Sequence, residues 1–191
     1  MQVTNIQLYK GIDFDSYQFK EGYSYSSIKN SDTEPFKATY KMQIGTEVHN
    51  YLLEPHTYKH ERRELIVPIA QAAYDVIGGV LPFVDTELSV TADFEHEGFT
   101  MGYRGRIDMV RCGKVVVDLK ISEMPLSKSI PYFGYDKQLT GYCLATQCNI
   151  GIIIRVNPKT RHTERVVIKQ DVEWWEQKVL ELGIPTEFYY N

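Results

Sequence analysis

Two solitary acidic residues in apolar, strand-like sequence constrain this 191-residue chain more than any other feature. The segment 105–122, GRIDMVRCGKVVVDLKIS, carries Asp108 and Asp118 among apolar residues, with Lys120 two positions after the second acid. Alternate side chains of a strand share a face, so Val116, Asp118 and Lys120 point to one side. A hairpin-like return would bring Asp108 beside the same strand. The pattern predicts that both acids converge on one point.

Charges grouped in this way have two readings. The structural reading is a buried ion pair between Asp118 and Lys120, with Asp108 as a turn cap. Because removing each charge from water costs on the order of several kcal/mol, this arrangement is an inefficient source of stability. The functional reading is a divalent cation, since Mg²⁺ is held by one or two carboxylates and keeps several waters. A nearby lysine would orient one of those waters or help to deprotonate it.

Hydrophobic periodicity predicts strands around these acids and helices that cover them. The expected elements are helices at about 34–53 and 62–80, a hairpin of two strands across 86–108, a strand at 114–121, a helix at about 132–147, strands at 149–156 and 162–169, and a final helix capped by Asp171. Pro68 would kink or restart the second helix. The strand at 149–156 is apolar on both faces, as expected inside a mixed sheet. This order predicts an α/β fold with a central mixed sheet flanked by helices.

Composition favours one soluble globular domain. The chain is 43% hydrophobic and 24% charged, with no internal repeat and no Pro/Gly-rich linker. We divide it into a segment of unassigned role at 1–24, a core at 25–170, and a C-terminal helix and tail at 171–191. No apolar run approaches the roughly 20 residues that span a bilayer, and the N-terminus lacks a signal-like core. A cytoplasmic location without membrane association is therefore expected.

The cysteines argue against one class of metal site. Cys112, Cys143 and Cys148 form no CxxC pair and are too few for a four-cysteine cluster. We expect free thiols and no iron–sulfur cluster.

The distribution of charge differs from its total. The net charge of −4 argues weakly against a nucleic-acid partner. However, five basic residues accompany two acids between Arg104 and Lys120, and five accompany one acid between Arg155 and Lys169. Such stretches are typical either of a solvated sheet edge or of an electrostatic footprint for phosphate. The charge pattern alone leaves both readings open.

A helical segment supplies two further candidates. In IGTEVHNYLLEP, Gly45 and His49 are four residues apart and share a helical face. The missing side chain at Gly45 would allow close approach of backbone or phosphate. His49 is either an ordinary histidine with satisfied hydrogen bonds or a metal ligand. Because imidazole suits Mn²⁺ better than Mg²⁺, a metal-bound His49 predicts tolerance of Mn²⁺.

Two other segments carry polar residues with open readings. Tyr135, Gln138 and Tyr142 share a face at helical spacing in YDKQLTGYCLA. They form either an aromatic core stripe with one polar interruption or a group that points into a site. Glu87 lies on the strand face opposite its apolar neighbours, either as an exposed acid or as part of the same site.

Four short motifs, GTEVH, GRID, DLK and QLTGY, occur in an order that resembles the PD-(D/E)XK nuclease superfamily, in its RecB-type branch. The upstream segment YSYSSIKNSDTEPFKA and the YLLEP that follows His49 further resemble RecE-type exonucleases (exonuclease VIII), which phages and prophages often encode. The resemblance spans about 25–169. It implies a restriction-endonuclease-like core of order αβββαβ.

The resemblance also implies roles for residues at matching positions. These roles are metal binding by His49, Asp108, Asp118 and the Leu119 carbonyl; positioning of the attacking water by Lys120; site organisation and DNA contact by Gln138 and Tyr142; and assistance by Glu87 as an additional acid. With a nuclease site between them, the basic stretches favour the phosphate reading. The expected DNA contacts are Gly45, Arg104, Arg106, Tyr135, Gln138 and Tyr142.

The implied activity is a Mg²⁺-dependent, Mn²⁺-tolerant DNA exonuclease. The RecE branch degrades one strand of duplex DNA from its 5′ end as a ring-shaped oligomer and feeds a single-strand annealing protein. By resemblance we expect a homo-oligomer that acts on linear duplex ends in recombination or repair, in a bacterial or phage-infected cell. Ile121 and Ser122 stand where the family commonly has threonines, so fine substrate contacts do not transfer to those two positions.

Three other functions remain as alternatives. One is a related nuclease that acts on single strands or flaps, a group in which many members carry a four-cysteine iron–sulfur cluster. A second is a non-catalytic DNA-binding module of the same fold. A third is a small-molecule enzyme with a mixed sheet, which has no motif in its favour.

Overall fold

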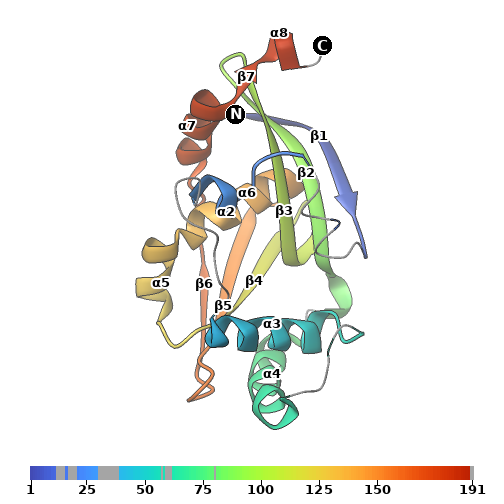
Figure 1. The fold of residues 1–191 in the computed structure, drawn as a ribbon, viewed down its shortest axis with the longest axis vertical. Helices are drawn as coiled ribbons and strands as arrows, with labels where there is room; N and C mark the ends of the chain where they lie inside the picture. Colours follow the sequence, from blue (N-terminus) through green and yellow to red (C-terminus); the bar gives the residue numbers. More distant parts are fainter. Residues whose placement is uncertain are drawn as a thin grey trace.

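The computed structural model describes residues 1–11, 16, 21–29, 39–56, 58, 62–79 and 81–189 (Figure 1). Within this part of the chain, a seven-stranded mixed sheet forms the centre. Its strands are β1 (Gln2–Tyr9), β2 (Asp85–His96), β3 (Phe99–Arg111), β4 (Val115–Ile121), β5 (Ile150–Val156), β6 (Thr163–Val167) and β7 (Ile184–Pro185). The order across the sheet is β1-β2-β3-β4-β5-β6, and β7 pairs with β3. β4 and β5 run parallel, whereas the other pairings among these strands are antiparallel.

The described part of the chain also contains helices. They are α2 (Tyr25–Lys29), α3 (Tyr40–Leu53), α4 (Arg63–Ile77), the 3₁₀ turn η1 (Leu81–Phe83), α5 (Leu126–Phe133), α6 (Tyr135–Thr146), α7 (Val172–Leu182) and α8 (Thr186–Tyr189). In the described part of the chain, none of them combines the length and the apolar character needed to cross a membrane.

Two hydrophobic cores lie on opposite faces of the sheet. α6 and α7 cover one core, which contains the fully buried Trp175, and α3 and α4 cover the other, which contains Ile69. Neighbouring residues of β4 alternate between these cores, because Val116 belongs to the first and Val117 to the second. The expected α/β fold, with a central mixed sheet flanked by helices, is confirmed.

The helix expected at 132–147 is in fact two helices. α5 ends at Phe133, and Gly134 follows with a φ of 68°. This left-handed conformation ends a helix and is readily adopted only by glycine. Tyr25 Oη and Lys29 Nζ of α2 donate to the Phe133 carbonyl at 2.8 and 3.0 Å. The break therefore serves as the docking point of α2.

Other differences concern the ends of elements. α3 begins at Tyr40, whereas the predicted helix began at 34; residues 34–38 lie outside the described part. Pro68 lies inside α4 and neither ends nor restarts it. The segment 1–24, in which no element was predicted, contains the edge strand β1. Its exposed and half-buried residues do not alternate regularly, so hydrophobic periodicity does not indicate a strand there.

Gly141 on α6 tests how tightly the first core is packed. A Cβ at this position would lie 2.6 Å from Trp175 Cζ2 and 3.0 Å from the Tyr103 hydroxyl. The Trp175 ring is held in place, since its Nε1 donates to the Lys137 carbonyl at 2.8 Å. We expect Gly141→Ala to lower the free energy of unfolding by about 1–2 kcal/mol, because overpacking exceeds the roughly 1 kcal/mol gain in helix propensity.

Urea denaturation of the variant and the native protein measures this difference. Gly79→Ala is the matched control, because nothing lies within 4 Å of a Cβ built there. Its effect should stay within about 0.5 kcal/mol. Equal stability of the two variants would show that α6 and α7 shift apart freely.

Candidate metal centre and active site

One cavity of about 1110 Å³ brings the candidate residues together. It lies between α3 and α6, with β2, β3 and β4 contributing side chains. The predicted site residues that line it are Gly45, His49, Glu87, Arg104, Arg106, Asp108, Asp118, Leu119, Lys120, Tyr135, Gln138 and Tyr142. Residues of α3, β2, β3, β4 and α6 thus line one pocket.

The two solitary acids lie where the pairing of β3 with β4 ends. The last backbone pair toward the cavity is Met109 with Val117, the chain neighbours of Asp108 and Asp118. Beyond it, the Asp108 side chain takes over, because its Oδ2 accepts a hydrogen bond from the Leu119 N–H at 2.7 Å. Asp108 and Asp118 consequently face the cavity from adjacent strands.

Glu87 reaches the same place from β2 through an unusual backbone. The pairs Thr86–Met109 and Leu88–Ile107 flank Glu87 and Asp108, which are not paired with each other. Glu87 has a φ of 49°, in the left-handed region that costs a non-glycine residue about 1–2 kcal/mol. Its side chain is only 12% exposed, so the reading of Glu87 as an exposed strand acid does not hold.

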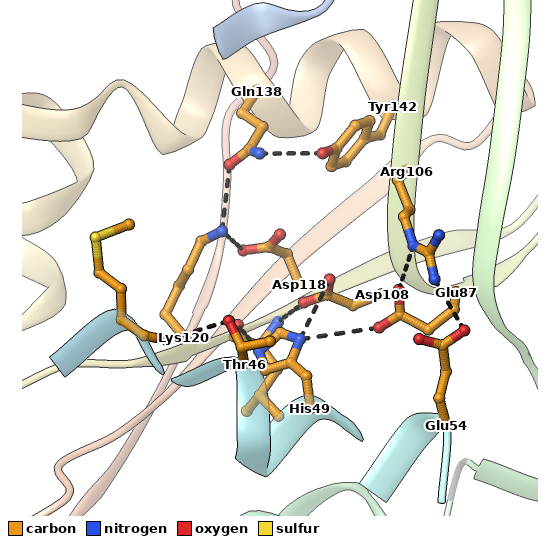
Figure 2. Close-up of polar contacts among 12 residues, drawn as sticks. Thr46, His49, Glu54, Glu87, Arg106, Asp108, Asp118, Lys120, Gln138 and Tyr142 are labelled. Carbon is orange, nitrogen blue, oxygen red and sulfur yellow. Dashed lines mark hydrogen bonds and ion pairs between the residues drawn. The ribbon is translucent and has the colours of Figure 1, made fainter. Parts of the chain in front are cut away.

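Three side chains form a group that could hold a metal ion. Ligand atoms of His49, Glu87 and Asp108 all lie within 4.8 Å of one another (Figure 2). His49 Nδ1 is 3.6 Å from Asp108 Oδ1 and 3.9 Å from Glu87 Oε1. The other ring nitrogen, Nε2, donates to the Leu119 carbonyl at 2.8 Å. This hydrogen bond fixes the ring so that Nδ1 faces the carboxylates, which is how metal-binding histidines are usually oriented.

The electrostatics of this group also fit a cation. Burial raises the pKa of Asp108, and the charges of Asp118 and Glu87 add to it, for a value of about 7. Burial lowers the pKa of His49, but the charges of Asp108 and Glu87 outweigh this effect and raise it to about 9. Negative charge is therefore crowded enough to retain protons near neutral pH. A divalent ion would replace those protons, and two carboxylates with an imidazole are a suitable ligand set.

Lys120 and its partners form the opposite side of the site. Lys120 Nζ is 2.8 Å from Asp118 Oδ2 and donates to Gln138 Oε1 at 3.3 Å (Figure 2). Gln138 Nε2 in turn donates to the Tyr142 hydroxyl at 3.0 Å, and Nζ lies 4.6 Å from the centre of the Tyr135 ring. Burial lowers the pKa of Lys120, but the charges of Asp118 and Asp108 outweigh this effect and raise the pKa above its ordinary value. Lys120 is thus a cation suited to donating hydrogen bonds.

Asp108 and Asp118, which the sequence predicted to converge, have different partners in the structure. Asp118 is only 2% exposed and turns its Oδ2 to Lys120, while Glu87 joins His49 and Asp108. The sequence could have placed Glu87 in the site, since its side chain lies on the same face of the sheet as that of Asp108. It was also interpreted as an exposed acid because a strand face opposite the core usually contacts solvent.

Arg106 and Glu54 add a contact that the sequence reading missed. Arg106 is 12% exposed, and its guanidinium donates to Glu87 Oε2 and Glu54 Oε1, each at 2.8 Å. Glu54 lies in the YLLEP segment that carried the family resemblance, but it had no assigned role. Arg106 thus faces carboxylates, and its predicted contact with DNA stays a prediction.

The second basic stretch is partly structural. Arg155 is 3% exposed and donates to the Ser122 carbonyl at 2.9 Å and to Glu164 Oε1 at 2.9 Å. Lys159 pairs with Glu123 at 2.7 Å. The phosphate reading is therefore wrong for Arg155, because its charge is used inside the fold.

Comparisons with known proteins give structural similarities only. No family model matches the chain, and no curated protein matches it. A phage-related exonuclease from Haemophilus somnus 129PT has a TM-score of 0.46 and 17% identity, over 86% of this chain and 91% of that one. An alkaline exonuclease from Laribacter hongkongensis has 0.42 and 15%, over 82% and 81%. The protein SSO0001 has 0.41 and 16%, over 76% and 84%. Because these TM-scores lie below 0.5, the three structures assign no function to this chain.

Metal affinity should depend on pH in a defined direction. A metal ion must displace the protons that His49 and Asp108 carry below their pKa values of about 9 and about 7. Between pH 7 and 8, binding of a metal ion releases about one proton, mainly from His49. The affinity for Mn²⁺ should therefore rise about tenfold over this interval. Free Mn²⁺ measured by EPR at each pH tests this. In His49→Ala the slope should flatten, and a pH-independent affinity of the native protein would contradict the assignment of His49 as a ligand.

Proposed function

We propose that this chain is a divalent-metal-dependent nuclease that hydrolyses phosphodiester bonds of DNA. One observation carries the proposal: the ligand atoms of His49, Glu87 and Asp108 meet within 4.8 Å in the same cavity as the Asp118–Lys120 ion pair. Phosphodiester hydrolysis needs a water made nucleophilic at neutral pH and donors for the charge that develops on the phosphate. A metal ion held by these three side chains, beside the fixed Lys120 ammonium group, would supply both the nucleophilic water and the charge stabilisation.

The metal ligands would be His49 through Nδ1, Glu87 and Asp108. Asp118 and the Leu119 carbonyl adjoin them, and we propose that they complete the coordination, since a carbonyl oxygen that accepts from His49 retains a second lone pair. When bound, Mg²⁺, or Mn²⁺ in its place, lowers the pKa of a coordinated water and stabilises negative charge on the phosphate.

Lys120 would act as a donor to the attacking water or to a phosphate oxygen. Its position is fixed from both sides, by Asp118 and by the Gln138 amide oxygen. The hydrogen bond from Gln138 Nε2 to Tyr142 keeps the amide oxygen turned toward Lys120. A group held in this way loses little entropy when substrate binds, which favours the reaction.

The finer proposal concerns substrate and assembly. The motif resemblance supports an exonuclease that resects one strand of linear duplex DNA from the 5′ end, as a homo-oligomer working with a single-strand annealing protein in the cytoplasm. Gly45, Arg104 and Tyr135 line the cavity and would contact the DNA. A Cβ at Gly45 would approach only Ile121, at 3.9 Å, so this position leaves open space for a strand.

Degradation of a linear duplex labelled at one 5′ end tests the proposal. With Mg²⁺ or Mn²⁺ the linear form should be lost and a closed circle should persist, whereas EDTA should stop all cutting. Lys120→Ala should lower the rate by about 10²–10³, the size of effect seen when a donor to developing charge is removed. Lys41→Ala is the matched control, because the exposed Lys41 is on α3 but pairs with Glu123 outside the cavity.

Other outcomes identify the alternatives. Cutting of the circle would indicate an endonuclease, and faster loss of single strands or flaps would favour the related nuclease branch. DNA binding with no metal-dependent cutting of any form would contradict the proposal and indicate a binding module.

A further inference from the structure

The two carboxylate oxygens of Glu87 face different partners. Oε2 accepts a hydrogen bond from Arg106 Nε at 2.8 Å, and Oε1 lies 3.9 Å from His49 Nδ1 (Figure 2). Only Oε1 therefore points to the group that would hold a metal ion. The guanidinium of Arg106 occupies the oxygen that would otherwise let Glu87 rotate or bind an ion through both oxygens.

Arg106 is itself anchored by Glu54. Arg106 Nη2 donates to Glu54 Oε1 at 2.8 Å, and both side chains are largely buried, at 12% and 18% exposure. Glu54 caps the C-terminal end of α3, and its N–H donates to the Asn50 carbonyl. The helix that carries His49 thus also carries the anchor for the arginine that contacts Glu87.

Glu54 also adjusts the charge of this network. An arginine next to a metal ligand would cancel the ligand charge and repel a cation. With Glu54 on its other edge, Arg106 is already neutralised, and Glu87 keeps its negative charge for the ion. Burial opposes ionisation of Glu87, but hydrogen bonds and charges from His49 and Arg106 lower its pKa.

The backbone of Glu87 makes such support necessary. A left-handed φ of 49° within a strand is strained and persists only where neighbouring structure holds it. The planar guanidinium can bond two carboxylates in fixed directions, which a lysine ammonium cannot reproduce.

We propose that Arg106, anchored by Glu54, is a positioning residue that fixes Glu87 so that a single oxygen faces the metal ion. This inference rests on the proposed metal centre. It gives Arg106 a role in metal affinity in place of the phosphate contact that the sequence suggested, and it gives Glu54 a role that no motif assigned.

The test measures Mn²⁺ affinity without DNA, by EPR of free Mn²⁺, in the native protein and in Glu54→Gln, Arg106→Lys and Glu87→Gln. Loss of a group that orients a metal ligand typically weakens metal affinity by about 10–100-fold. We expect a loss of at least about tenfold in Glu54→Gln and Arg106→Lys, and a larger loss in Glu87→Gln. Far-UV circular dichroism establishes that each variant is folded, and Glu54→Gln preserves the side-chain shape.

Glu47→Gln is the matched control. Glu47 lies on the same helix, is 22% exposed and pairs with Arg62 at 2.8 Å, but it does not line the cavity. Its Mn²⁺ affinity should equal that of the native protein. An equal loss in Glu47→Gln and Glu54→Gln would overturn the inference, because any ion pair of α3 would then have the same effect.

A DNA-binding arm in EDTA separates the two roles of Arg106. If Arg106 instead contacts phosphate, Glu54→Gln should leave Mn²⁺ affinity unchanged and tighten DNA binding, because it releases the guanidinium; that result overturns the inference. A native protein that binds Mn²⁺ but cuts no DNA would contradict the proposed function alone, and the loss of affinity in Glu54→Gln would still support the inference. Absence of Mn²⁺ binding by the native protein would overturn both.

Discussion

The repulsion among buried carboxylates is the constraint on which the rest of the site depends. Glu87, Asp108 and Asp118 enter one cavity from three adjacent strands, and each is held by a different donor. Arg106 supports the first, the Leu119 N–H the second and Lys120 the third. These donors reduce the repulsion without removing it, since burial raises the pKa of Asp108 and the charges of Asp118 and Glu87 still add to this effect, for a value of about 7. The arrangement therefore favours a bound cation, which a purely structural ion-pair network would not need.

The fold around the acids could be predicted because its signals are local. Period-two alternation in β2, β3 and β4 and the apolar run of β5 depend only on neighbouring residues. The same alternation places Asp108 and Asp118 on the cavity side of their strands. The break between α5 and α6 also had a local signal, because glycine after an aromatic helix end is typical of a left-handed cap. It was missed because the aromatic and apolar spacing continues across Gly134.

Contacts that depend on how elements dock could not be predicted. Glu54 and Arg106 are 52 residues apart, and their contact exists because the end of α3 lies over β3. Neither residue has a spacing that indicates the other. Arg155 shows the same limit for the interpretation of charge. The sequence pattern of a basic stretch is the same whether an arginine in it faces solvent or donates to buried carbonyls. Its actual role, joining the end of β4 to Glu164 on β6, became visible only with the sheet assembled.

The position of His49 on α3 has a consequence for local unfolding. The helix reaches the sheet through the hydrogen bond from His49 to the Leu119 carbonyl and through the Arg106–Glu54 pair. An ion bound by one ligand from α3 and two from the strands would add its binding free energy to the cost of detaching this helix. Amide hydrogens of α3 would then exchange more slowly as metal concentration rises, while those protected only by global unfolding in β5 would respond to a different degree. In this architecture, metal binding and the local unfolding of α3 are therefore thermodynamically coupled.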